Sequence, residues 1–118
     1  MKKLLLLLLF ISLIFSCGDN DIPKKEKFNT LIKGSWSPTI VFESGLGTPL
    51  SNWDKIQTRI SANYKTISYD RKGLGQSPAT DNPRTLKNLV NDLDILITQN
   101  KIDGPIVLVG HSLGGHIV

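Results

Sequence analysis

The chain has 118 residues, of which 40% are hydrophobic, and its formal net charge at pH 7 is +4. Its basic residues form no block of the size that nucleic-acid binding requires, so a nucleic acid is not an expected partner. The single cysteine, Cys17, excludes a disulfide within the chain.

The first sixteen residues have the pattern of a secretory signal peptide. Lys2 and Lys3 give a short basic start, and an apolar run over residues 4–15 follows, interrupted only by Ser12. A permanent membrane helix needs about 20 residues, so this shorter run favours cleavage. Removal of residues 1–16 would leave twelve basic and ten acidic residues, so the formal charge would fall to about +2.

The end of the apolar run resembles the lipobox of bacterial lipoproteins, in which a small residue precedes the cysteine that becomes lipidated. Ser16 and Cys17 occupy these two places. The resemblance implies a protein of the bacterial cell envelope, anchored to a membrane by lipid on Cys17. The alternative is ordinary signal cleavage near Ser16, which would leave an unmodified thiol.

Residues 17–35 are expected to form a flexible tether between the anchor and the first strand. The segment "GDNDIPKKEKFN" is polar, mixed in charge and without periodicity. An electrostatic contact of Lys24, Lys25 and Lys27 with the membrane surface is the alternative interpretation.

The folded part of the chain is predicted to begin with a strand and a helix. The apolar, β-branched run at 39–42 predicts a strand that ends in a glycine loop at 43–47. Ser51 followed by Asp54 resembles a helix capping box, and apolar residues at helical spacing then predict a helix over about 51–63.

A second strand, a long helix and a third strand follow. Residues 64–70 predict a strand closed by the loop "RKGLGQS", and Pro83 suits the first turn of a helix. Apolar side chains then trace one helical face from Leu86 to Ile97. The run at 106–109, apolar throughout, predicts a strand buried on both faces.

This alternation predicts an α/β fold with a parallel sheet and right-handed crossovers. In such sheets, ligands bind beyond the carboxyl ends of the strands, where the glycine loops lie. The two "GLG" sequences, at 45–47 and 73–75, have neither the spacing of a dinucleotide-binding loop nor the G-K-[ST] of a P-loop. These loops therefore predict no nucleotide cofactor, and the sequence predicts no other cofactor and no metal site.

The segment "VLVGHSLGG", residues 107–115, joins the last strand to the pattern G-x-S-x-G. In this pattern a serine occupies a strained strand-to-helix turn, and its hydroxyl is exposed above the sheet. Gly110 and Gly114 carry no Cβ, which lets the strand end and the first helical turn approach closely. The alternative is an ordinary glycine-rich turn in which Ser112 only caps a helix.

Three segments together resemble the amino-terminal half of the α/β-hydrolase superfamily. They are "VFESGLGTPLSNW", "ISYDRKGLGQS" and "VLVGHSLGG", in the family's order and at its intervals. The resemblance covers residues 36–118 and implies an incomplete parallel-sheet α/β-hydrolase core that ends just after the serine turn.

The resemblance also implies roles for individual residues. Ser112 would be the nucleophile, and the backbone amides of Leu46 and Leu113 would hold the oxyanion. Asp70 and Arg71 match positions that are mostly structural in the family, and Trp53 is expected to pack beneath the first glycine loop. Members commonly have His-Gly at this loop, whereas this sequence has Ser44 and Gly45.

The resemblance implies a serine hydrolase acting on a small-molecule ester, amide or related bond through an acyl-enzyme. In this family the acid and the histidine follow the nucleophile, but no Asp or Glu follows Ser112. His111 and His116 are not expected to act as the base. We therefore expect these residues to be a fragment or truncated product that is inactive alone. The alternatives are a non-catalytic lipid-anchored binding protein and an inactive remnant of the same fold.

Overall fold

The computed structural model describes residues 27–118. The predicted signal peptide and the lipidation of Cys17 lie outside the described residues. No helix within residues 27–118 has the length and apolar character needed to cross a membrane. The elements in chain order are β1 (Thr30–Lys33), β2 (Thr39–Glu43), the 3₁₀ helix η1 (Leu50–Trp53), α1 (Asp54–Ile60), β3 (Lys65–Tyr69), α2 (Leu86–Gln99), β4 (Ile106–Gly110) and the 3₁₀ helix η2 (Ser112–His116).

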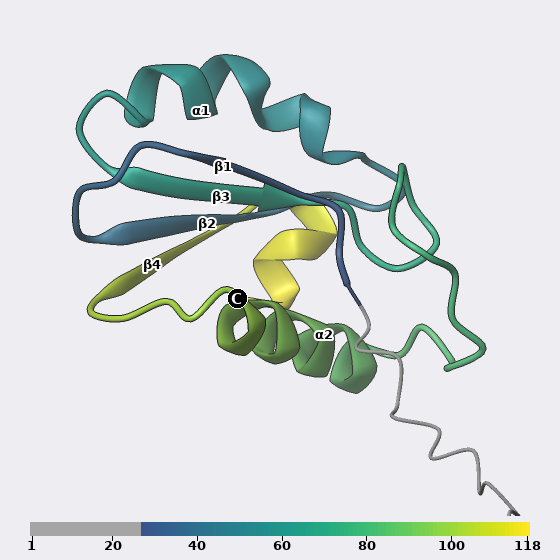
Figure 1. Ribbon diagram of the computed structural model, residues 1–118. Helices are drawn as coiled ribbons and strands as arrows, with labels where there is room; N and C mark the ends of the chain where they lie inside the picture. The colour runs from purple at the N-terminus through teal and green to yellow at the C-terminus, as the bar shows by residue number, and fades with distance from the viewer. Residues whose placement is uncertain (1–26) are drawn as a thin grey trace, which may run out of the picture.

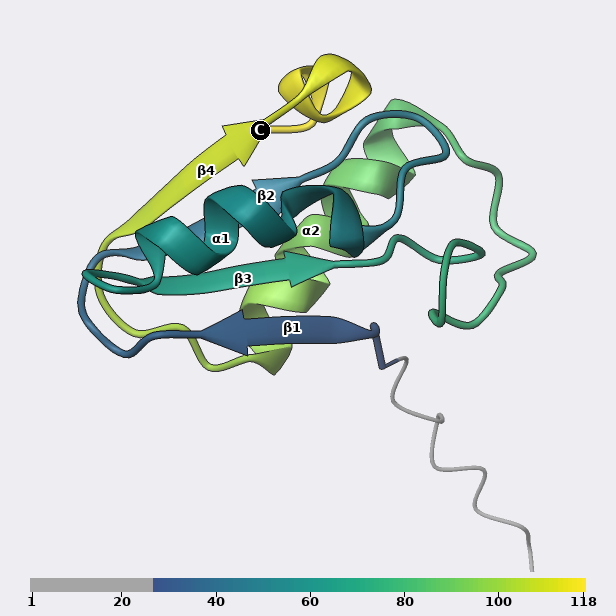
Figure 2. The ribbon, with the colours of Figure 1, turned by 90° about the horizontal axis from the view of Figure 1, so that it is seen from above.

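The four strands form one mixed sheet in the order β1-β3-β2-β4. β2 is parallel to both β3 and β4, and its Phe42 lies opposite Ser68 on one side and Val109 on the other. β1 runs antiparallel to β3, as Figure 2 shows. The predicted α/β class and the parallel pairing of the three predicted strands are confirmed, and β1 adds an antiparallel edge strand that the sequence analysis did not predict.

β1 lies within residues 17–35, where a flexible tether was expected, and this boundary is corrected. Thr30 to Lys33 pair with β3, and the Asp70 amide donates to the Asn29 carbonyl at 3.0 Å. Phe28 is buried, and its ring meets the Tyr69 ring edge-on at 5.5 Å. Backbone pairing and one aromatic anchor therefore order a short segment that has no periodicity of its own.

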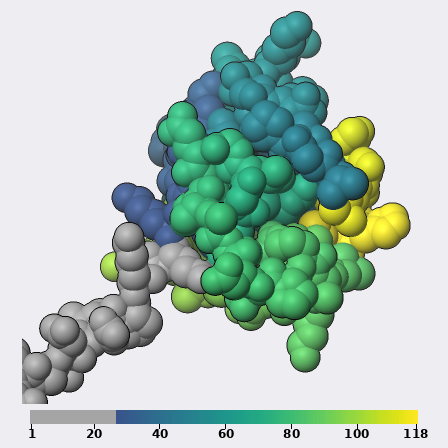
Figure 3. All heavy atoms as spheres, turned by 90° about the vertical axis from the view of Figure 1, so that its right-hand side faces the viewer, coloured from purple at the N-terminus to yellow at the C-terminus, as the bar shows by residue number. Residues whose placement is uncertain are grey.

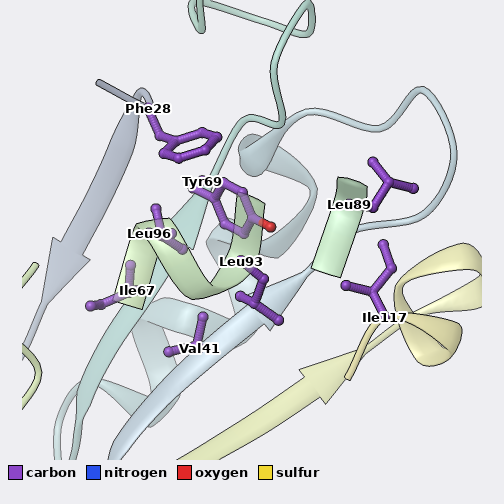
Figure 4. Close-up of a cluster of buried hydrophobic side chains, with 8 residues drawn as sticks. All are labelled: Phe28, Val41, Ile67, Tyr69, Leu89, Leu93, Leu96 and Ile117. Carbon is purple, nitrogen blue, oxygen red and sulfur yellow. The ribbon is translucent and has the colours of Figure 1, made fainter. Parts of the chain in front are cut away.

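The two helices cover opposite faces of the sheet, α1 on one and α2 on the other (Figure 1). The larger cluster of buried side chains lies between the sheet and α2, with Ile117 added from the C-terminal segment (Figure 4). The smaller cluster consists of Ile40, Phe42 and Trp53, against which Ile60 and Val109 pack. The sheet is thus the central layer of a three-layer arrangement.

The helix predicted from Leu86 is confirmed as α2, but its cap is Thr85, whose side chain accepts from the Asn88 amide. Pro83 precedes the helix. The capping box at Ser51 does not form, because Ser51 lies inside η1 and no side chain caps either η1 or α1.

β4 is less buried than its apolar sequence predicted. Val107 is 44% exposed and Leu108 is 38% exposed. In the part of the chain that the structure describes, β4 pairs with β2 on one side only. A parallel strand is buried on both faces only where neighbouring elements cover it.

Candidate functional site

Ser112 begins the turn that leaves β4, and its backbone has a φ of +53°. A non-glycine residue in this left-handed region costs roughly 1–2 kcal/mol. The turn is held by the amide of the preceding residue, His111, which donates to the Glu43 carbonyl at 3.1 Å. The conformation of Ser112 is therefore fixed by the joined ends of β4 and β2.

Two glycines make this turn possible. A Cβ on Gly110 would lie 2.5 Å from the carbonyl group of Gly114. A Cβ on Gly114 would overlap the carbonyl oxygen of Glu43 and lie 2.9 Å from that of Ser44. The close approach predicted from the G-x-S-x-G pattern is present, and at Gly114 it extends to the end of β2.

The glycine loop after β2 lies beside Ser112. A Cβ on Gly45 would be 3.5 Å from the Ser112 Cβ and 3.2 Å from the His111 Nδ1. Figure 3 shows the C-terminal residues, in yellow, against the blue segment that follows β2. The structure thus brings the loop that contains Leu46 to Ser112 and Leu113.

The backbone amides of Leu46 and Leu113 are available to a ligand. Within residues 27–118, neither N–H donates a hydrogen bond to the protein. Leu113 lies in the first turn of a helix, where amides have no partner within the helix. The Leu46 side chain is 81% exposed.

An open hollow of about 400 Å³ lies next to these two leucines. Its walls combine apolar side chains with three cationic ones. They are Leu46, Gly47, Arg71, Lys72, Gly73, Leu74, Ala79, Thr80, Arg84, Leu89 and Leu113. A partly apolar small molecule could therefore be held beside the loop and the Ser112 turn.

Asp70 ties three segments together at the carboxyl end of β3. Its carboxylate accepts from the Leu50 amide at 2.7 Å, the Asn29 side chain at 2.7 Å and the Gln76 amide at 3.0 Å. Burial alone would raise the pKa of Asp70, but these hydrogen bonds together lower it. A Cβ on Gly75 would collide with this carboxylate. Asp70 therefore has the structural role that the sequence resemblance implied.

Arg71 and Glu43 form a buried ion pair beneath the glycine loop. Arg71 Nη1 lies 2.6 Å from Glu43 Oε1, and the Tyr69 hydroxyl donates to Glu43 Oε2. Burial raises the pKa of the Glu43 carboxyl, and the hydrogen bonds from Tyr69 and Arg71 oppose this effect. Burial likewise raises the pKa of Tyr69.

Sequence reasoning missed Glu43 as a member of the site. The available signal was a carboxylate placed directly after the apolar run "TIVF", since a buried charge requires a partner. Trp53 packs as expected, because its ring stacks on Phe42 at 4.8 Å and its Nε1 donates to Ser44 Oγ at 2.8 Å.

The described residues supply Ser112 with no hydrogen-bonded base. Within residues 27–118, neither the His111 nor the His116 imidazole takes part in a hydrogen bond or ion pair. No group of three or more His, Cys, Asp or Glu side chains in this part of the chain is placed to hold a metal ion.

A three-layer α/β core with a serine in a left-handed turn beyond a parallel strand is the arrangement of α/β-hydrolases. The family described as "alpha/beta hydrolase fold" matches residues 38–118, and the chain belongs to this family. The match begins at the entry to β2 and includes both the glycine loop and the Ser112 turn.

Particular relatives share this region. The chain is 35% identical over 85 residues to the uncharacterized protein YqjL of Bacillus subtilis, covering 72% of this chain and 34% of that protein. It is 40% identical over 65 residues to 3-oxoadipate enol-lactonase 1 of Acinetobacter baylyi, covering 54% and 24% respectively. An enol-lactonase structure from Burkholderia xenovorans superposes with a TM-score of 0.70 and 31% identity, covering 76% of this chain and 35% of that one. The chain therefore spans about a third or less of these relatives.

Proposed function

We propose that this chain carries the nucleophile of a serine hydrolase that cleaves an ester, amide or related bond. The observation that carries the proposal is the left-handed backbone of Ser112, between two glycines that tolerate no Cβ and beside the exposed Leu46 loop. A nucleophile elbow requires a serine in such a strained turn, and this agreement supports the proposal. The enol-lactonases among the relatives favour an ester, including a cyclic one.

In the proposed reaction, Ser112 Oγ loses its proton to a base and attacks the carbonyl carbon of the substrate. The amides of Leu46 and Leu113 stabilise the oxyanion of the tetrahedral intermediate. Its collapse breaks the bond to the alcohol or amine, which leaves with a proton, and water then hydrolyses the acyl-serine. No step requires a cofactor.

The proposal places the base and its acid partner outside residues 27–118. The described residues present no base to Ser112, and the relatives are about three or more times as long as the matched region. The activity therefore belongs to the polypeptide in which this segment joins those residues, and residues 27–118 alone would be inactive.

The test is covalent labelling of the native protein from its host with a fluorophosphonate probe. Labelling and p-nitrophenyl acetate hydrolysis should both be lost in Ser112→Ala, since an unactivated serine reacts poorly. Ser51→Ala, at an exposed residue of η1, is the matched control and should retain both. A folded wild-type protein that resists the probe would instead support a non-catalytic binding protein.

We also propose that Cys17 is lipidated and holds the protein on a membrane of the bacterial envelope. The support is the basic start, the apolar run and the Ser16-Cys17 pair. Cys17→Ser should move the protein out of the membrane fraction and change its processed mass. A variant that stays in that fraction with unchanged processing would contradict the anchor.

A further inference from the structure

We propose that the buried Glu43–Arg71 pair positions the backbone amide of Leu46 for oxyanion binding. Both side chains are positioning residues, because neither is proposed to touch the substrate. The inference rests on the proposed function for its catalytic consequence, and on the contacts of the loop alone for its structural content.

Arg71 donates hydrogen bonds to two successive carbonyl groups of the glycine loop. Nη1 donates to the Ser44 carbonyl at 2.5 Å, and Nη2 donates to the Gly45 carbonyl. The planar guanidinium presents its donors in a fixed fork, so two contacts define the orientation of the loop. An ammonium group at this position could not reproduce both contacts with the same geometry.

Two donors hold the peptide that carries the Leu46 N–H, because Arg71 Nη2 and, at 3.3 Å, the Thr48 amide both donate to the Gly45 carbonyl. The Gly45 carbonyl and the Leu46 N–H belong to one peptide group, which is planar and trans. In a trans peptide the C=O and N–H directions are opposed, so a carbonyl held toward Arg71 turns the N–H away from it. The same hydrogen bond polarises the peptide and strengthens the N–H as a donor.

Glu43 fixes the guanidinium that holds this peptide. One carboxylate oxygen accepts from Arg71 and the other from Tyr69, and the residue is completely buried. The Glu43 carbonyl accepts the His111 amide, which precedes Ser112. Glu43 therefore contacts the Ser112 turn through its backbone carbonyl. Its side chain acts on the glycine loop through Arg71.

Trp53 also holds the loop, because its Nε1 donates to Ser44 Oγ at 2.8 Å. The loop is thus held both by the Ser44 hydroxyl, which accepts from Trp53, and by the buried Glu43–Arg71 pair. These contacts together fix the orientation of the Leu46 backbone N–H.

The kinetic test introduces Arg71→Lys and Glu43→Gln into the native protein from its host. Arg59→Lys, at an exposed residue of α1, is the control. Removal of one oxyanion donor typically costs 100- to 1,000-fold in kcat, so a misdirected Leu46 amide should cost about 10- to 100-fold. With p-nitrophenyl acetate, KM should change less than about three-fold, because the ester does not need the oxyanion contacts in its ground state. Urea unfolding verifies that each variant is folded.

A second readout separates this inference from the proposed function. In ¹⁵N relaxation and chemical-shift measurements, the Leu46 amide signal should shift and its order parameter should fall in Arg71→Lys and Glu43→Gln, but not in Arg59→Lys. If the wild-type protein is not labelled by fluorophosphonate, the proposed function fails. The Leu46 amide signal then still tests whether Glu43 and Arg71 position this amide. An unmoved Leu46 signal, or folded variants with wild-type kcat, would overturn the inference.

Discussion

Adjacent glycines in the turn after Ser112 have opposite surroundings. A Cβ on Gly114 would overlap the carbonyl oxygen of Glu43, whereas a Cβ on Gly115 would meet nothing within 4 Å. Gly114→Ala should therefore lower the free energy of unfolding by about 1–3 kcal/mol, the range of overpacked cores. It should also displace the end of β2, which carries the glycine loop that contains Leu46.

Gly115→Ala is the matched control and should change the free energy of unfolding by less than about 0.5 kcal/mol. Urea denaturation of the two variants gives the comparison directly. Equal losses of stability in both variants would show that the Glu43 carbonyl does not restrict this turn.

Asp70 predicts a pH dependence of stability with a defined sign. Its pKa is lowered in the folded protein, so its stabilisation is present above the ordinary value of 3.8 and is lost as the pH falls through the folded value. Asp70→Asn should cost about 2 kcal/mol at pH 7, because hydrogen bonds to a charged acceptor are replaced by poorer ones. The difference from wild type should narrow below about pH 4.

The measurement is the free energy of unfolding by urea at pH 7 and at pH 3. Asp81→Asn, at an exposed position of the neighbouring loop, should stay within about 0.5 kcal/mol of wild type at both. A constant difference between Asp70→Asn and wild type across this range would contradict a charge-dependent role for Asp70.

The candidate site could be predicted from sequence only where its residues are local. Ser112 and its glycines lie within five positions, so their pattern carries the geometry of the turn. Glu43 and Arg71 are 28 positions apart and meet because β2 and β3 are parallel neighbours. The Glu43–Arg71 pair depends on the register between β2 and β3, and this register cannot be predicted from the sequence of either strand alone.

At the scale of elements, apolar periodicity correctly predicted a helix, whereas the capping signal at Ser51 did not predict where a helix begins. The apolar stripe of α2 identified the helix, because it records burial against one face of the sheet. The Ser51–Asp54 pair has the composition of a capping box, but the backbone enters a 3₁₀ turn at Leu50, before Ser51 can act as a cap. Asp70, which accepts from the Leu50 amide, helps to fix this entry from a distant loop.

β1 shows a related limit. Four residues cannot display a clear alternation, and their order comes from pairing with β3 and from the buried Phe28 beside them. Short edge strands are therefore the elements that sequence patterns detect least well.

At the scale of the whole molecule, the sheet formed by residues 27–118 has two unlike edges. β1 is short and ends in a lysine, whereas β4 presents apolar side chains on both faces, with Val107 44% and Leu108 38% exposed. A hydrophobic edge strand with unpaired backbone groups is a template for pairing with another chain. A polypeptide consisting of residues 27–118 should therefore self-associate at micromolar concentrations.

A charge on this edge should oppose that association. Val107→Lys places a cation on β4, while Val90→Lys changes a residue of similar exposure, 43%, on α2. Both variants add one charge and remove one exposed apolar side chain, so net charge and overall hydropathy are matched. Sedimentation velocity should show a lower associated fraction for Val107→Lys and little change for Val90→Lys, because only the former blocks backbone pairing at the edge. A monomeric wild-type segment, or equal effects of the two lysines, would show that β4 does not drive the association.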